Sequence, residues 1–293
     1  MKKNIIDTHI HIWDLQKGRY KWLDGDTSIL NRTYKIEELL PEMARTPVAA
    51  RVLVQAANTL EDTELMLETA RRHEEIIGIV GWLPLQEPKK TEALLQDRVL
   101  KEPYFKGVRH LIHNEQYPQW LLQPTVLESL GILAAYNIPF DVVGINEGHL
   151  RTAIRVGEKI PALRMVLDHL NQPPVKADEQ FDTWGSLMKE ISYNGNVYAK
   201  ISGLGTASGN FRGWTADDIT PCISYVLTEF GTSRCFCGGD WPVSTLAGSY
   251  SMHWERYIRV INNLLSEEEA EKVFFKNAAA FYNLSLAENK NNF

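Results

Sequence analysis

Two histidines, His9 and His11, stand two residues apart at the end of the first apolar run of the sequence, residues 5–10. Side chains two positions apart on a β-strand lie on the same face, so both imidazoles are expected to point the same way. Neutral imidazoles can hold a divalent cation or bind a substrate oxygen. Two buried polar rings are costly without partners, which favours a functional pair over two packed core histidines.

A third imidazole and a carboxylate end two later apolar runs. His169 closes the segment 166–170 and could orient water or bind a substrate oxygen. Its neighbour Asp168 should point to the opposite face and cap the following turn. Asp240 follows two glycines at the end of the last apolar run. Partly shielded from water, such a carboxylate can act as general base and then as general acid, whereas the alternative is a cap on the next helix.

Short apolar runs rich in β-branched residues recur along the chain, and stretches of helical period lie between them. The runs are residues 5–10, 50–56, 77–83, 105–112, 138–143, 163–170, 196–203 and 234–240, and the helical stretches include 62–73, 125–136, 150–159, 183–193 and 216–230. This alternation indicates parallel strands covered on both faces. We therefore predict an α/β fold, a (β/α)8 TIM barrel spanning residues 1–293 as a single domain, with its site at the carboxyl ends of the strands. A doubly wound open sheet is the alternative, but the first turn lacks the Gly-x-Gly-x-x-Gly pattern of nucleotide-binding folds.

Further residues are candidates for substrate binding. Arg109 on the fourth strand could pair with a carboxylate or polarise a carbonyl, and Lys200 on the seventh faces either the lumen or the outside. Three tryptophans follow predicted strands: Trp13, Trp82 and Trp241. They could wall the pocket against sugar C–H faces or planar rings, or simply seal the barrel top. The long connection at residues 15–35 could cover the mouth of the barrel.

Composition narrows the possible functions. The 293 residues carry a formal net charge of −6 and contain no basic run, which argues against nucleic-acid and anionic-membrane partners. Neither a signal peptide nor an apolar stretch of roughly 20 residues is evident. Three cysteines are too few for a disulfide scaffold, and Cys235 and Cys237 are expected to pack against the barrel. We expect a cytoplasmic protein with a small-molecule substrate, and leave homo-oligomerisation open.

In their order, these motifs resemble the amidohydrolase superfamily, and more narrowly its branch of sugar lactonases and 2-pyrone-4,6-dicarboxylate lactonases. The similar segments run along nearly the whole chain: IIDTHIHIWD, KWL, RVLVQAA, GIVGWLPL, FKGVRHLIH, IPFDVVG, MVLDHLNQPP, AKISGL, CFCGGDWPVS and KNAAAFYNL. The resemblance implies the barrel, hydrolytic chemistry and catalytic roles for His9, His11, His169 and Asp240. It also implies that no cofactor is required, since the branch includes members that work without metal.

The sequence departs from the superfamily's metal-rich members. Those members usually carry a lysine on strand four or a histidine on strand five, whereas this chain has Arg109 and the histidine-free segment 139–143. His9, His11 and Asp240 then remain as ligands for one weakly bound divalent cation such as zinc, and not for a bridged metal pair. Gly239 stands where relatives often have serine.

Together these observations lead us to expect a hydrolase that opens a lactone, namely a sugar-derived aldonolactone such as fucono-, rhamnono- or galactonolactone. Asp240 would activate a water held with His169. The developing oxyanion would be stabilised by His9, His11 and Arg109. One alternative is a metal-dependent decarboxylase or hydratase of aromatic carboxylic acids, which predicts a stoichiometric ion. Another is a non-catalytic small-molecule binding barrel, which would not need a matched base and electrophile.

Overall fold

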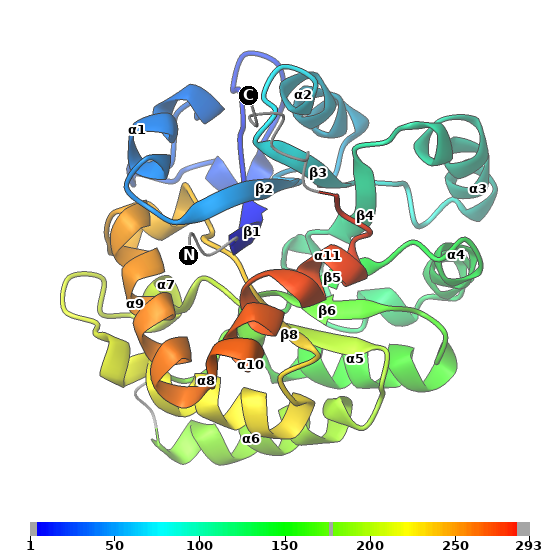
Figure 1. Cartoon of the computed structure of the whole chain (residues 1–293). Coiled ribbons are helices and arrows are strands. Elements are labelled where there is room, and N and C mark those ends of the chain that lie inside the picture. The colour runs from blue at the N-terminus through cyan, green and yellow to red at the C-terminus, as the bar shows by residue number, and fades with distance from the viewer. Residues whose placement is uncertain (1–4, 176–177, 286–293) are drawn as a thin grey trace.

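The structure, a computed structural model, describes residues 5–175 and 178–285. Its strands form one eight-stranded sheet in the order β1 to β8, and every neighbouring pair in that order is parallel (Figure 1). The strands are β1 (Ile5–Ile10), β2 (Val48–Val54), β3 (Ile76–Gly81), β4 (Phe105–His110), β5 (Phe140–Val142), β6 (Met165–Leu167), β7 (Val197–Ile201) and β8 (Cys235–Cys237). The predicted TIM barrel is confirmed, with several strands shorter than their apolar runs.

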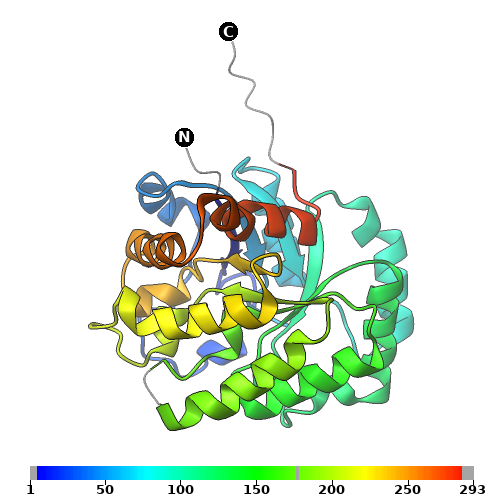
Figure 2. The same ribbon diagram turned by 60° about the horizontal axis from the view of Figure 1, so that its bottom comes forward.

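Helices surround the sheet, and Figure 2 shows them side by side around the barrel. They are α1 (Leu40–Met43), α2 (Leu60–Ala70), α3 (Pro88–Asp97), α4 (Pro124–Ala135), α5 (Glu147–Lys159), α6 (Asp178–Ser192), α7 (Leu204–Ala207), α8 (Ala216–Phe230), α9 (Tyr250–Leu264), α10 (Glu267–Glu271) and α11 (Asn277–Phe281). Side-chain caps mark the starts of several of them. Thr59 accepts the N–H of Asp62 at α2, and Thr215 forms a capping box with Asp218 at α8. No helix within the described ranges is long and apolar enough to cross a bilayer.

Strands β1 and β8 meet at a seam that closes the barrel. The backbone N–H of Asp240 donates to the carbonyl of His9 at 2.6 Å, and that of His11 donates to Trp241 at 2.6 Å. Next to these two backbone bonds, the hydroxyl of Thr8 donates to the carbonyl of Cys237 at 2.7 Å. The seam therefore runs directly through the segments that carry the predicted site.

A β-bulge in β1 changes which side chains face the lumen. Asp7 pairs with Arg51 and Ile10 with Leu53, so three steps along β1 match two steps along β2. The extra residue interrupts the simple alternation of faces. Asp7 accordingly lies against helix α9, while His9 faces the lumen. The bulge thus allows an outward carboxylate and an inward imidazole only two residues apart.

The amino-terminal end of the barrel is closed by α11 and the residues after it (Figure 1). Phe281, Tyr282 and Leu284 pack against apolar side chains from the strands, among them Val52 and Phe236. The three cysteines are buried and free, as expected for packing thiols. The floor of the barrel is therefore apolar, and polar residues begin above it.

Candidate active site

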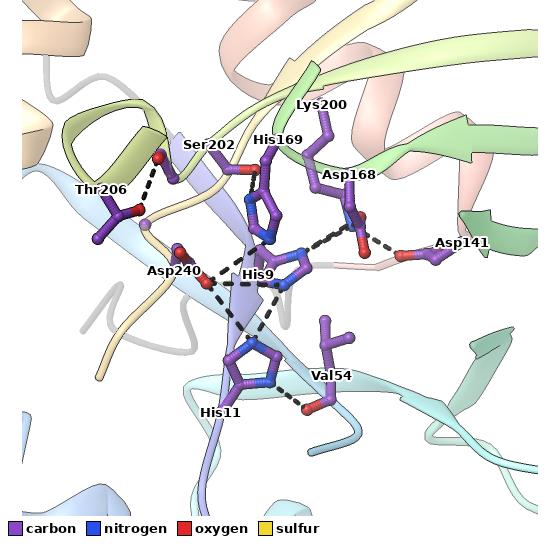
Figure 3. A network of polar contacts seen from close by, with 12 residues as sticks. His9, His11, Val54, Asp141, Asp168, His169, Lys200, Ser202, Thr206 and Asp240 are labelled. Atoms are coloured by element: carbon purple, nitrogen blue, oxygen red, sulfur yellow. Dashed lines mark hydrogen bonds and ion pairs between the residues drawn. The ribbon is translucent and has the colours of Figure 1, made fainter. Parts of the chain in front are cut away.

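The structure brings together the four residues predicted to form the site (Figure 3). Oδ1 of Asp240 lies 3.5 Å from Nε2 of His11, 3.8 Å from Nε2 of His169 and 3.9 Å from Nε2 of His9. All four residues are buried, and all lie at or beyond the carboxyl ends of strands β1, β6 and β8. Three imidazoles thus surround one carboxylate at the end of the barrel where TIM-barrel active sites occur.

Backbone conformation directs two of these side chains. His169 and Asp240 have φ values of 54° and 56°, in the left-handed region that non-glycine residues seldom adopt. His169 begins a run of four left-handed residues that ends at Gln172. Gly203 faces both, because a Cβ there would lie 2.7 Å from Nδ1 of His169 and 3.0 Å from Oδ2 of Asp240. Strained backbone of this kind is concentrated at functional sites.

A balanced set of four charges lies beneath the imidazoles. Nζ of Lys200 contacts Asp141 at 2.7 Å and Asp168 at 2.9 Å, and Arg109 donates to Asp168 at 3.1 Å. Tyr282, from the segment that closes the floor, donates its hydroxyl to Asp141. Two cations therefore match two anions, which reduces the cost of burying them.

The expectation that Asp168 faces away from the site is wrong. Asp168 is fully buried and faces His9, Arg109 and Lys200. Strand β6 ends at Leu167, so the alternation of faces that the prediction assumed does not extend to Asp168 and the left-handed residue after it. Burial acts to raise the pKa of the Asp168 carboxyl, but Lys200 and His9 outweigh it and hold that pKa well below its ordinary value.

Burial shifts the pKa values of the three imidazoles and of Asp240 in opposite directions. It lowers the pKa of His9 well below the ordinary value, lowers that of His11 to about 3, and also lowers that of His169. The three rings are therefore neutral near pH 7. Burial also raises the pKa of Asp240, although His169 and Arg109 act against it. A carboxylate with a raised pKa is a better proton acceptor near neutral pH.

The ring nitrogens of His9 and His11 suit a cation. Nδ1 of His11 faces the carbonyl of Val54 at 2.7 Å, so this nitrogen is assigned as a donor. Nδ1 of His9 lies 3.3 Å from Asp168 and 3.2 Å from Nζ of Lys200, and Nε2 of His9 is assigned as the acceptor because Arg109, which can only donate, faces it. Both Nε2 lone pairs then face Asp240. Their spacings of 3.1, 3.5 and 3.9 Å are close to the ~3.3–3.6 Å between ligands of a tetrahedral zinc ion. His9, His11 and Asp240 therefore fit one divalent cation, while Nη1 of Arg109 at 3.3 Å also faces Nε2 of His9.

A cavity of about 370 Å³ opens above the site. Its polar lining comes from His11, Arg109, His113, His169, Gln172, Thr206 and Asp240, and its apolar lining includes Trp22, Leu111, Val143, Ile145 and Val243. This size suits a small molecule. Lys200 is fully buried below the cavity and is absent from its lining, whereas Arg109 reaches it.

The three predicted wall tryptophans lie outside this lining. Trp13 packs edge-on against Trp22 at 5.1 Å between ring centroids, and Trp241 packs against Tyr34. Trp82 donates its indole N–H to His110, away from the site. The tryptophan that lines the cavity is Trp22, held by a 2.8 Å bond to the carbonyl of Ala56. It comes from the connection at residues 15–35, which therefore contributes a cavity wall.

Sequence reasoning missed Asp141, whereas Trp22 belongs to the connection that was expected to cover the mouth of the barrel. Asp141 is an isolated charge in the apolar segment 139–143, on a strand covered on both faces. A lone carboxylate in such a strand can be accommodated only toward a polar lumen, and this signal could have placed it beside Lys200.

This geometry defines a TIM-barrel enzyme whose site combines a buried carboxylate with imidazoles that fit a metal ion. A family model described as amidohydrolase matches residues 6–284, and the chain belongs to this family.

Curated relatives cover almost the whole chain. The chain is 30% identical over 283 residues to an L-fucono-1,5-lactonase of Burkholderia ambifaria, covering 95% of both proteins. It is 29% identical over 287 residues to an L-fucono-1,5-lactonase of Burkholderia multivorans, covering 95% of this chain and 96% of the relative. Among solved structures, an amidohydrolase from Burkholderia multivorans with bound zinc has a TM-score of 0.87 and 28% identity, covering 96% of this chain and all of the other.

Proposed function

We propose that this protein hydrolyses the lactone of a sugar acid. The observation that carries the proposal is the placement of Asp240 within 3.9 Å of three neutral imidazoles, beneath a cavity of small-molecule size. The similarity to L-fucono-1,5-lactonases supports a sugar lactone as the substrate class. Fucono-, rhamnono- and galactonolactone are the substrates we propose to test first.

The proposed reaction begins with Asp240 as general base. It takes a proton from a water molecule that His169 orients, and the resulting hydroxide attacks the lactone carbonyl. The ring C–O bond then breaks, and protonated Asp240 returns its proton to the departing alkoxide. The net change is the addition of one water to the ester bond. The raised pKa of Asp240 suits both proton transfers.

Arg109 is the donor best placed for the developing oxyanion. Its guanidinium lines the cavity and is fixed from below by Asp168 and by the backbone carbonyl of Gln55. A preorganised cation of this kind stabilises charge that forms in the transition state. His9 and His11 present lone pairs and would hold a divalent cation together with Asp240. Such an ion, when bound, supplies Lewis-acid polarisation of the carbonyl.

The cavity offers both surfaces that a sugar lactone requires. Trp22 presents an aromatic ring to C–H groups. Gln172, His113 and Thr206 provide polar atoms for hydroxyl groups on other parts of the wall. We infer that these residues, and not the buried Lys200, select the sugar.

The test is acid release from a lactone panel in weak buffer with a pH indicator. The panel contains L-fuconolactone, L-rhamnonolactone, D-galactonolactone and an unsubstituted lactone. We expect hydrolysis of at least one sugar lactone, and a loss of about 1,000-fold in kcat in Asp240→Asn. Asp217→Asn, an exposed change on α8, is the matched control and should retain full activity. The absence of acid release above the Asp240→Asn level for every lactone would reject the proposal.

A further inference from the structure

Asp7 connects the two strands of the seam through a single oxygen atom. Its Oδ1 accepts the backbone N–H of His9 at 2.9 Å and that of Gly239 at 2.8 Å. His9 is one of the site imidazoles, and Gly239 immediately precedes Asp240. Asp7 is fully buried on the outside of the barrel and is absent from the cavity lining, so it does not contact a substrate.

Helix α9 fixes the orientation of this carboxylate. The hydroxyl of Tyr250 donates to Oδ2 of Asp7 at 2.7 Å, and the indole N–H of Trp254 donates to the same oxygen at 3.3 Å. An ionised carboxylate can accept two such bonds on each oxygen, so all four donors are satisfied by the charged form. Burial raises the pKa of Asp7. The four donors come from strand β1, from Gly239 after strand β8 and from helix α9, and together they hold the carboxylate in place.

The glycine at position 239 makes room for this arrangement. A Cβ there would lie 2.5 Å from Oδ2 of Asp7 and 2.6 Å from the ring of Tyr250. A larger residue would displace the carboxylate or the helix that anchors it. The close packing of Asp7 against Tyr250 therefore requires glycine at position 239.

We propose that Asp7 is a positioning residue that sets the separation of His9 and Asp240 across the seam. The backbone bond from Asp240 to the carbonyl of His9 joins the two segments at one point, and the shared Oδ1 of Asp7 adds a second link through the N–H groups of His9 and Gly239. The two links together fix how far the segments can shift or rotate relative to each other. A displacement of ~1 Å at a reacting group can lower the rate by about 100-fold. This inference rests on the proposed function insofar as Asp240 and His9 act in the reaction.

Asp62 provides a matched control for the loss of a buried acceptor. It is also buried, and it accepts the N–H of Ala56 at 2.8 Å, the N–H of Ala57 at 3.4 Å and the hydroxyl of Tyr20 at 3.0 Å. Its carboxylate thus loses comparable bonds when it is truncated, but it does not bridge β1 and β8. Asp7→Ala and Asp62→Ala should therefore destabilise the fold to similar extents.

The experiment compares kcat and KM at a temperature where near-ultraviolet circular dichroism shows each variant folded. We expect Asp7→Ala to lower kcat by about 10- to 100-fold with KM within about threefold, and Asp62→Ala to keep kcat within about threefold. Asp7→Asn retains one acceptor oxygen and should recover most of the lost kcat. Equal kcat losses in Asp7→Ala and Asp62→Ala would overturn the proposal, because Asp7 would then act only on stability.

Two further measurements keep the test decisive. If Asp7→Ala does not fold, the double variant Tyr250→Phe, Trp254→Phe leaves Oδ2 without these donors and should lower kcat by about 3- to 10-fold. A kcat within twofold of the wild type would contradict the proposal. Ring signals of His9 and His11 in protein labelled with [15N]histidine should shift in the Asp7 variant and not in the Asp62 variant. This readout is independent of lactone hydrolysis, so a failed substrate panel and a failed positioning role are distinguishable.

Discussion

The Nε2 atoms of His9 and His11 face each other at 3.1 Å, while Nδ1 of His11 faces the carbonyl of Val54 and Nδ1 of His9 faces Asp168 and Lys200. Two lone pairs and the nearby Asp240 carboxylate favour a cation between them. We expect about one zinc ion per chain after dialysis against zinc and removal of the excess. His11→Gln should lose this ion, as measured by elemental analysis. His73→Gln, in a partly exposed histidine paired with Glu37 and Glu75, is the control, and equal zinc content in both variants would contradict the assignment.

The pH dependence of hydrolysis should follow Asp240. The base acts only when ionised, and burial raises the pKa of Asp240, so kcat/KM should fall as pH falls through this raised value. The pKa of His11 is lowered to about 3, which keeps that ring neutral across the range. We expect an acid limb with a midpoint above pH ~4, the ordinary value for aspartate, in initial rates measured between about pH 4 and 8. A limb at or below the ordinary value would argue against Asp240 as the base.

Lys200 should contribute mainly to stability. Lys200→Met leaves Asp141 and Asp168 without their shared cation, and we expect a loss of about 3–5 kcal/mol in the free energy of unfolding. Adding Asp141→Asn to this variant should recover part of the loss. Urea denaturation measures both changes, and Lys189→Met, in an exposed pair with Glu229, should change stability by less than about 1 kcal/mol.

The sign of the Lys200 contribution with pH follows from its ionisation. Burial acts to lower the pKa of Lys200, but Asp141 and Asp168 outweigh it and raise that pKa. The stabilisation from this group is therefore complete below the ordinary lysine pKa of ~10.4 and is lost as pH rises through the folded value. Wild-type and Lys200→Met proteins should differ most in stability near neutral pH.

Alanine substitutions at Gly203 and at Gly209 separate the effect of backbone strain from the effect of steric contact with the site. Both have positive φ, 61° and 65°, so alanine at either position should cost about 1–2 kcal/mol in stability. At Gly203 the new Cβ would also meet His169 and Asp240, whereas at Gly209 nothing lies within 4 Å. We expect kcat to fall at least about tenfold in Gly203→Ala and to stay near wild type in Gly209→Ala. Similar kcat values in the two variants would show that Gly203 does not shape the site.

The positions of His9, His11 and Asp240 could be predicted from sequence because two general rules apply to them. Parallel strands of a barrel present their carboxyl ends at one rim, and residues two apart on a strand share a face. Neither rule depends on details of packing. The alternation of apolar runs also indicated all eight strands, although the ends of the short strands β5, β6 and β8 could not be placed from composition alone.

The features that could not be predicted depend on local departures from regular strands or on tertiary contacts. Asp168 sits where β6 gives way to a left-handed turn, so alternation gives the wrong face for it. Trp22 lies in a connection whose path is set by its packing against Trp13 and by its hydrogen bond to the carbonyl of Ala56, which follows strand β2. The bulge between Asp7 and Ile10 likewise has no clear sequence signature. Such features follow from tertiary packing, which a single sequence does not reveal.

The seam between β1 and β8 also affects how the chain acquires its activity. Thr8 and Cys237, and Asp7 and Gly239, are bonded across separations of 229 and 232 residues. Contacts between such distant segments form late, because the intervening chain must first be ordered. During refolding, helical circular dichroism should therefore return before catalysis, and a partly assembled barrel would possess most of its secondary structure while remaining inert.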